Sequence, residues 1–115
     1  MFPWSYSCKK TTSDDEDLFE AAIGASTALR RVHGRSFEVG SICQVSLTAP
    51  GESVDWTYAD AGVRWSFAME LRGGVYGFLI PPREIVPSGE ETLAALESLA
   101  EFVLKISLTE SPAKV

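Results

Sequence analysis

The fold is decided by one alternating stretch, Val63-Arg64-Trp65-Ser66-Phe67-Ala68-Met69-Glu70-Leu71-Arg72. Large apolar side chains occupy every second position, and small or charged side chains stand between them. A period of two residues is typical of a β-strand with one buried face. Two glycines follow at once and interrupt the pattern. The stretch therefore predicts a strand over 63–71 whose apolar face is turned toward a core.

Two helices are predicted on either side of this strand. Apolar residues at helical spacing predict a helix over 15–33 and another over about 89–107. Capping boxes at Ser13–Glu16 and at Ser88–Glu91 mark the starts of these two helices.

Shorter elements are predicted between the two helices. Residues 37–47 are rich in β-branched and apolar side chains and predict one bent strand or two short strands. Residues 54–61 predict a short helix in which Asp55 caps the start, while Trp56 and Tyr58 join the core. The resulting order of helices and strands indicates an α/β fold with partly parallel pairing.

The length and the net charge of the chain limit the class of protein and the partners that are expected. The chain has 115 residues, which is enough for one small domain. Its net charge of −6 argues against nucleic acid and against anionic membrane surfaces as partners. We find no run of 18 apolar residues and no basic start followed by an apolar stretch, so neither a membrane span nor a signal peptide is expected.

Few side chains are candidates for chemistry. His33 is the single histidine, and the helix dipole explains its place in the last turn of a helix. A zinc site needs several converging ligands, so one histidine does not predict such a site. Cys8 and Cys43 are either a disulfide or two buried thiols, and composition leaves both alternatives open.

Glu70 stands near the carboxyl end of the predicted strand, where ligands bind in α/β sheets. Partial desolvation there would raise the pKa of its carboxyl group and suit a general base. A salt bridge to Arg72 or to Arg64 is the alternative. The spacing of these residues leaves the two alternatives equal.

Six blocks follow one another along the chain: Phe2-Pro3-Trp4-Ser5-Tyr6, Gly40-Ser41-Ile42-Cys43, Gly51-Glu52-Ser53-Val54-Asp55-Trp56-Thr57-Tyr58, Trp65-Ser66-Phe67-Ala68-Met69-Glu70-Leu71-Arg72, Tyr76-Gly77-Phe78-Leu79-Ile80-Pro81 and Ile85-Val86-Pro87. In this order they resemble the zinc metallocarboxypeptidases of the carboxypeptidase A/B family, peptidase M14. The resemblance covers residues 1–107.

The resemblance implies a fold and an activity. The family's fold is an α/β/α sandwich around a mixed sheet, so residues 1–110 are expected to be the C-terminal part of such a domain, followed by a tail at 111–115. The family removes one residue from the C-terminus of a peptide or protein. Zinc, held by two histidines and one glutamate, polarises the scissile carbonyl and activates a water. Glu70 matches the general base that takes the proton of this water.

The resemblance also assigns substrate-binding residues. Val54 matches the base of the side-chain pocket, where an acid selects Lys and Arg and an apolar residue selects hydrophobic C-termini. Ala68 and Phe78 match the pocket wall, and Ile42 is a weaker match. Leu47 stands where most members have a mobile tyrosine that closes over the substrate. The resemblance therefore implies a preference for hydrophobic C-terminal residues.

Two further implications concern the whole protein. The family's zinc ligands would all precede Met1, so the chain is expected to hold no zinc ligand and to be inactive alone. Cys8 and Cys43 match a pair that is bridged in some members, which implies an extracellular or vacuolar parent. The chain is thus expected to be a fragment of a zinc metallocarboxypeptidase. The alternative is a non-catalytic module that binds peptide C-termini.

Overall fold

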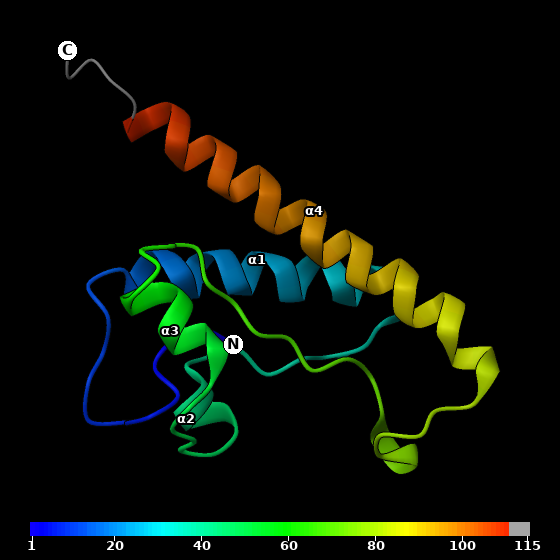
Figure 1. The fold of residues 1–115 in the computed structure, drawn as a ribbon. Helices are drawn as coiled ribbons and strands as arrows, with labels where there is room; N and C mark the ends of the chain where they lie inside the picture. Colours follow the sequence, from blue (N-terminus) through cyan, green and yellow to red (C-terminus); the bar gives the residue numbers. More distant parts are fainter. Residues whose placement is uncertain (111–115) are drawn as a thin grey trace. The chain divides into compact units, whose positions relative to one another are not determined.

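A computed structural model describes residues 1–110, so the expected tail at 111–115 lies outside the described residues. The chain divides into two compact units. Unit 1 is formed by Met1–Ile23 and Phe37–Glu70, and unit 2 by Gly24–Ser36 and the chain from Leu71 onward. Figure 1 labels the α-helices; the helical elements in order are α1 (Asp15–His33), α2 (Ile42–Val45), α3 (Ser53–Ala59), the 3-10 turns η1 (Gly74–Tyr76) and η2 (Pro82–Glu84), and α4 (Ile85–Glu110).

Helix α1 confirms the helix predicted over 15–33. Its first turn is acidic and its last turn is basic, so each end carries the charge that the helix dipole favours. Gly34 ends the helix at a φ of 76°, which glycine adopts without steric cost. The N–H of Gly34 donates to the carbonyl of Arg30 over 2.7 Å and closes the last turn.

The core of unit 1 is built around the first half of α1. Buried and half-buried apolar side chains meet there: Phe2, Leu18, Ala22, Val39, Tyr58, Trp65 and Phe67. Phe2 is 2% exposed, and burial of such a side chain contributes about 1.5–3 kcal/mol. Trp65 and Phe67 come from the predicted strand and pack against this core, whereas Val63 and Leu71, predicted on the same face, are exposed.

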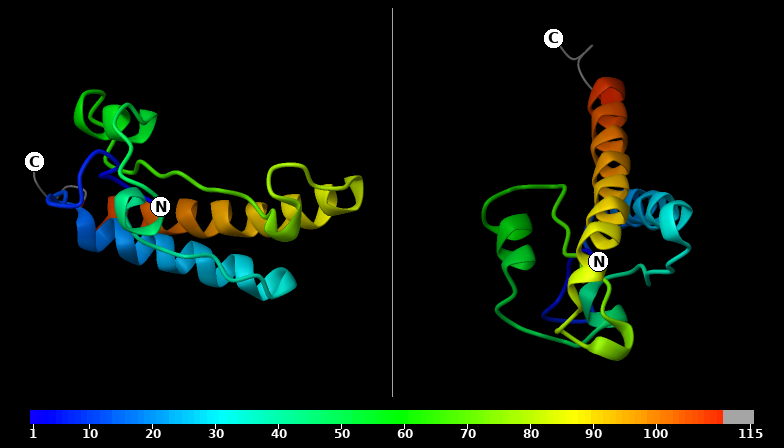
Figure 2. Two further views of the ribbon diagram at one scale, coloured as in Figure 1. Left: turned by 90° about the horizontal axis from the view of Figure 1, so that it is seen from below. Right: turned by 90° about the vertical axis from the view of Figure 1, so that its right-hand side faces the viewer.

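The strand predicted over 63–71 does not form in the described residues. The segment after α3 is drawn without an arrow (Figure 2), and the pairing present is a single parallel bridge between Phe2 and Ser41. Ala68 exchanges two backbone hydrogen bonds with Met1, each of 2.9 Å. A strand needs a neighbour that pairs with it over several residues, and here the pairing is limited to the single residue Met1. The predicted mixed sheet is therefore not confirmed.

The strand predicted within 37–47 is wrong for residues 42–45, which form helix α2. The carbonyl of Ser41 accepts hydrogen bonds from the N–H groups of Gln44 and Val45, which turns the backbone into a helix. The N–H groups of Ile42 and Cys43 also donate to the carbonyls of Phe2 and Trp4, so contacts with the N-terminal segment outweigh the β-propensity of this stretch. Helix α3 confirms the short helix predicted at 54–61.

Unit 2 contains the longest helix, α4, which begins earlier than the predicted 89–107. The turn η2 leads directly into it, and Pro87 lies in its first turn, where a missing N–H costs little. The capping box predicted at Ser88–Glu91 is wrong. Both side chains are buried inside α4, together with Ala95 one turn further on.

Helix α4 packs against the second half of α1 within unit 2, and the two helices run antiparallel (Figures 1 and 2). A Cβ atom added to Gly24 would lie 3.3 Å from the Oγ of Ser98, so the two helices approach closely there. The ring of His33 lies 3.4 Å from the carboxylate of Glu90. In the described part of the chain, none of the helices has both the length and the apolar run needed to cross a bilayer.

Candidate active site

Glu70 ends the extended segment of unit 1, and its side chain is exposed. The desolvation expected from a strand in a sheet is therefore not supplied by the described residues. Glu70 lies close enough to the amino group of Met1 to raise the pKa of that group, although burial has the larger effect and lowers the pKa overall.

Arg72, proposed above as a partner of Glu70, is engaged by two other carboxylates. Its Nε donates to the Oε2 of Glu91 over 3.1 Å, its Nη2 donates to the Oε1 of Glu91, and its Nη1 donates to Glu84 over 2.6 Å. These hydrogen bonds raise the pKa of Arg72, and the bonds that it donates to Glu91 have the largest effect. The hydrogen bond with Arg72 lowers the pKa of Glu84, and the charges of Arg72, Arg35 and Arg83 act in the same direction.

This cluster in unit 2 was missed from the sequence. The side chain of Arg72 is 7% exposed and that of Glu91 is 1% exposed, so the pair is a buried ion pair with two hydrogen bonds. The signal that could have found Glu91 is its position within an apolar helical pattern, whereas the capping-box motif indicates a helix start at the same place.

Arg64 likewise has carboxylate partners on α1 and just before it. Its Nε donates to Asp14 over 2.8 Å, and its Nη2 donates to Asp17. The hydroxyl of Tyr58 also donates to Asp14, over 2.6 Å. These bonds join three separate segments of unit 1, and Tyr58 packs against the core as predicted.

Two predicted substrate-binding residues, Ile42 and Ala68, are each hydrogen-bonded to the start of the chain. The N–H of Ile42 donates to the carbonyl of Phe2 over 3.0 Å, and Ala68 bonds to Met1. The three segments therefore lie side by side in the order of strands in a sheet, with a spacing of about 5 Å between neighbours. Ile42 is buried and Ala68 is half-buried.

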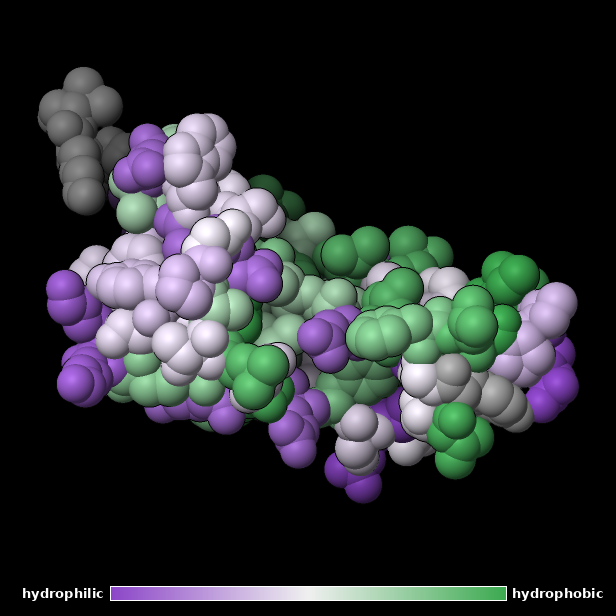
Figure 3. Space-filling model, turned by 60° about the horizontal axis from the view of Figure 1, so that its bottom comes forward, coloured by the Kyte–Doolittle hydropathy of each residue, from purple (hydrophilic) through white to green (hydrophobic). Residues whose placement is uncertain are grey.

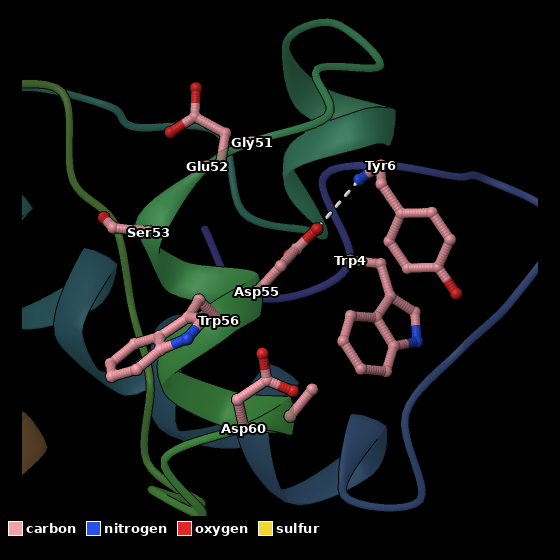
Figure 4. Close-up of a pocket in the computed structure, with 9 residues that line it drawn as sticks. Trp4, Tyr6, Gly51, Glu52, Ser53, Asp55, Trp56 and Asp60 are labelled. Atoms are coloured by element: carbon pink, nitrogen blue, oxygen red, sulfur yellow. Dashed lines mark hydrogen bonds between the residues drawn. The ribbon is translucent and has the colours of Figure 1, made fainter.

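Val54, the predicted base of the side-chain pocket, is buried on α3. The next residue, Asp55, accepts hydrogen bonds from the backbone N–H groups of Ser5 and Tyr6 over 2.9–3.1 Å. Asp55 is therefore not the cap that the sequence predicted; Glu52 occupies the N-cap position. Its carboxylate instead fixes the N-terminal aromatic segment beside α3 (Figure 4).

The two remaining predicted substrate-binding residues are exposed. Leu47 is exposed in unit 1, and Phe78 is fully exposed in unit 2. Figure 3 shows apolar side chains gathered over the segment from η1 to the start of α4, and the exposed ones are Val75, Phe78, Leu79, Ile85 and Val86. The described residues therefore leave the pocket wall that Phe78 would form uncovered.

The cysteines form a disulfide within unit 1. Cys8 and Cys43 are bonded, with their Cα atoms 5.5 Å apart and a sequence separation of 35. The bond joins the N-terminal segment to α2. The structure therefore contains the disulfide, and not the two buried thiols that composition left as the alternative.

The zinc ion implied by the resemblance does not fit the donor set of this chain. Among the described residues, no three His, Cys, Asp or Glu side chains converge in a group that could hold a metal ion. The cysteines are bonded to each other, and His33 faces Glu90 on the surface of unit 2.

Comparisons with known proteins identify the family. A model of the zinc carboxypeptidase family matches residues 1–95. The chain is 47% identical to mouse carboxypeptidase A2 over 90% of its own length and 24% of that protein. It is 39% identical to carboxypeptidase B of the crayfish Astacus astacus over 90% of its own length and 34% of that protein. The inactive metallocarboxypeptidase ECM14 of Uncinocarpus reesii is 36% identical over 90% of the chain and 20% of that protein.

A solved structure is similar along most of the chain. Bovine thrombin-activatable fibrinolysis inhibitor, in complex with tick carboxypeptidase inhibitor, matches with a TM-score of 0.85 and 40% identity, over 90% of this chain and 35% of that one. The chain thus spans about a fifth to a third of the length of these relatives. The match over 83% of the chain (95 of 115 residues) shows that it belongs to the zinc carboxypeptidase family.

Proposed function

We propose that this chain is the C-terminal part of a zinc carboxypeptidase that removes hydrophobic residues from the C-termini of peptides. The observation that carries the proposal is the family match over residues 1–95. Glu70 would act as general base, accepting a proton from the attacking water. The zinc ligands would come from residues outside this chain, and the chain alone would be inactive.

The substrate preference rests on Val54 at the base of the side-chain pocket. An apolar side chain there cannot pair with the charge of Lys or Arg, whereas it can pack against aliphatic and aromatic side chains. Ala68, Phe78 and Ile42 would complete the walls. Leu47 cannot supply the hydroxyl of the tyrosine that closes over the substrate in most members, so we expect weaker substrate binding.

The same proposal extends to the fold and the compartment. In the complete domain, residues 63–71 would be a strand of a mixed sheet, with the neighbours that unit 1 lacks. The disulfide between Cys8 and Cys43 supports an extracellular or vacuolar parent, because such bonds persist in oxidising compartments.

The decisive first experiment is to sequence the transcript upstream of the codon for Met1. We expect a reading frame that encodes a His-x-x-Glu motif and a later histidine. A stop codon directly upstream, with no such motif, would exclude the proposal. The purified chain should also fail to hydrolyse a peptide that ends in phenylalanine, with or without added zinc.

Two variants of the longer protein then test the residue roles. Glu70→Gln should lower kcat about 10²–10⁴-fold with little change in KM, because a positioned base contributes to the transition state. Val54→Asp should shift the preference from C-terminal Phe to C-terminal Arg. Glu38→Gln, at an exposed carboxylate of unit 1, is the matched control and should change neither. Equal kcat in the Glu70→Gln and control proteins would refute the base.

A second candidate function is a non-catalytic module that binds peptide C-termini. The similarity of the chain to inactive metallocarboxypeptidase ECM14 supports this second function. It predicts a soluble monomer that binds a peptide ending in phenylalanine, and loses the binding when the C-terminal carboxylate is amidated. Aggregation of the purified chain, or equal binding of both peptides, would exclude this function.

A further inference from the structure

The outer side of α3 in unit 1 presents an indole ring between two carboxylates. Glu52, Trp56 and Asp60 follow one another at intervals of four residues, so they lie in a row along the helix and its caps. Trp56 is 61% exposed, which corrects its predicted place in the core. An exposed tryptophan of this kind is free to meet a ligand.

This row forms one side of a pocket of about 550 Å³, and the side chains of Trp4 and Tyr6 lie on the other (Figure 4). In the view of Figure 4 the rings of Trp56 and Trp4 stand on either side of Asp60. The residues that line the pocket include three acids and no base. Asp55 is held by backbone N–H groups, whereas Glu52 and Asp60 are exposed.

The aromatic wall already accepts a cation. The Nζ atom of Lys10 lies 5.9 Å from the centroid of the Tyr6 ring, within the range of a cation–π interaction. Tryptophan is a better cation–π partner than tyrosine. The ring of Trp56 and its flanking carboxylates therefore have the chemistry that a second cation needs.

We propose that this pocket binds a basic side chain, lysine or arginine, of a polypeptide. The alkyl part of the ligand packs on the indole of Trp56, and its charge lies beside Asp60, while Glu52 adds a more distant negative charge. The site involves neither Glu70 nor Val54, so it does not depend on the proposed peptidase activity.

The test follows the indole N–H signals of the purified chain by NMR during addition of N-acetyl-arginine amide, N-acetyl-lysine amide or N-acetyl-norleucine amide. We expect saturable shifts of the Trp56 signal with both basic ligands. Binding of the neutral norleucine ligand should be about tenfold weaker, because it lacks the cation–π and charge contributions. Added salt should weaken binding of the basic ligands, since their partners are exposed.

Variants locate the site. Trp56→Leu keeps an apolar side chain and should weaken binding about two- to fivefold. The double variant Glu52→Gln/Asp60→Asn should lose most of the difference between the basic and neutral ligands, while Glu38→Gln should bind as the unchanged chain does. Equal binding of arginine and norleucine amides, or no saturable shift, would overturn the proposal even if a variant failed to fold.

Discussion

Replacement of Glu91 tests the buried ion pair of unit 2. In the Glu91→Ala chain, the guanidinium of Arg72 loses the two hydrogen bonds to this carboxylate and keeps the one to Glu84. Arg72 stays charged in the variant, because a guanidinium is not deprotonated in proteins, and its side chain is only 7% exposed. The variant therefore leaves a poorly solvated cation with one partner.

The magnitude follows from two independent arguments. Each hydrogen bond to a charged group contributes about 1.5–3 kcal/mol, and Glu91 supplies two of them. Removal of one partner from a buried ion pair costs about 3–5 kcal/mol. The two arguments agree on a loss of about 3–5 kcal/mol from the free energy of unfolding for Glu91→Ala. Glu91→Gln, which can still accept a hydrogen bond, should lie at the lower end.

The assay is urea unfolding of the 115-residue chain, followed by far-UV circular dichroism of the helices. Glu97→Gln, at an exposed carboxylate on the same helix, is the matched control and should change the free energy by less than about 0.5 kcal/mol. The double variant Arg72→Met/Glu91→Met should lose less than the sum of its single variants, since it leaves no unpaired charge between them. A loss below about 1 kcal/mol for Glu91→Ala would refute the reasoning.

Three further predictions concern the N-terminal segment and the pH range. Replacement of Cys8 and Cys43 by serine opens a loop of 35 residues and should lower stability by about 4 kcal/mol, measured against the unchanged chain in urea. Asp55→Ala leaves backbone N–H groups without a partner and should cost about 1–3 kcal/mol, whereas Asp60→Ala should cost little. The pKa of Glu84 is lowered from 4.5, so its stabilising effect is complete above about pH 4.5 and is lost as the pH falls through the folded-state value; Glu84→Gln should remove this part of the acid transition.

The helices could be predicted where their signals are local. The charge pattern and terminal glycine of α1 lie within the helix itself, so 15–33 was predicted correctly. The alternation over 63–71 correctly predicted that Trp65 and Phe67 face the core, but it was wrong for Val63 and Leu71, which are exposed. It could not predict pairing, because a strand depends on a neighbour elsewhere in the chain, and here the neighbour is Met1.

The residues of the candidate site also differ in how far the sequence could predict them. The roles of Glu70 and Val54 came from the resemblance and remain predictions, since exposure and burial alone do not test them. The disulfide, also implied by the resemblance, is present in the structure. Glu91 and Trp56 were assigned wrongly because capping motifs and apolar character are local, whereas a buried ion pair and an exposed indole are set by distant segments.

Helix α4 connects these observations with the proposed function. Ser88, Glu91 and Ala95 are buried on one side of it, where unit 2 supplies the neighbours. The opposite side is also apolar, and these four residues on it are each more than half exposed: Val86, Leu93, Leu96 and Leu104. A helix that is apolar on both sides is typical of the interior of a larger domain. In the larger domain proposed above, residues outside this chain would cover that second side.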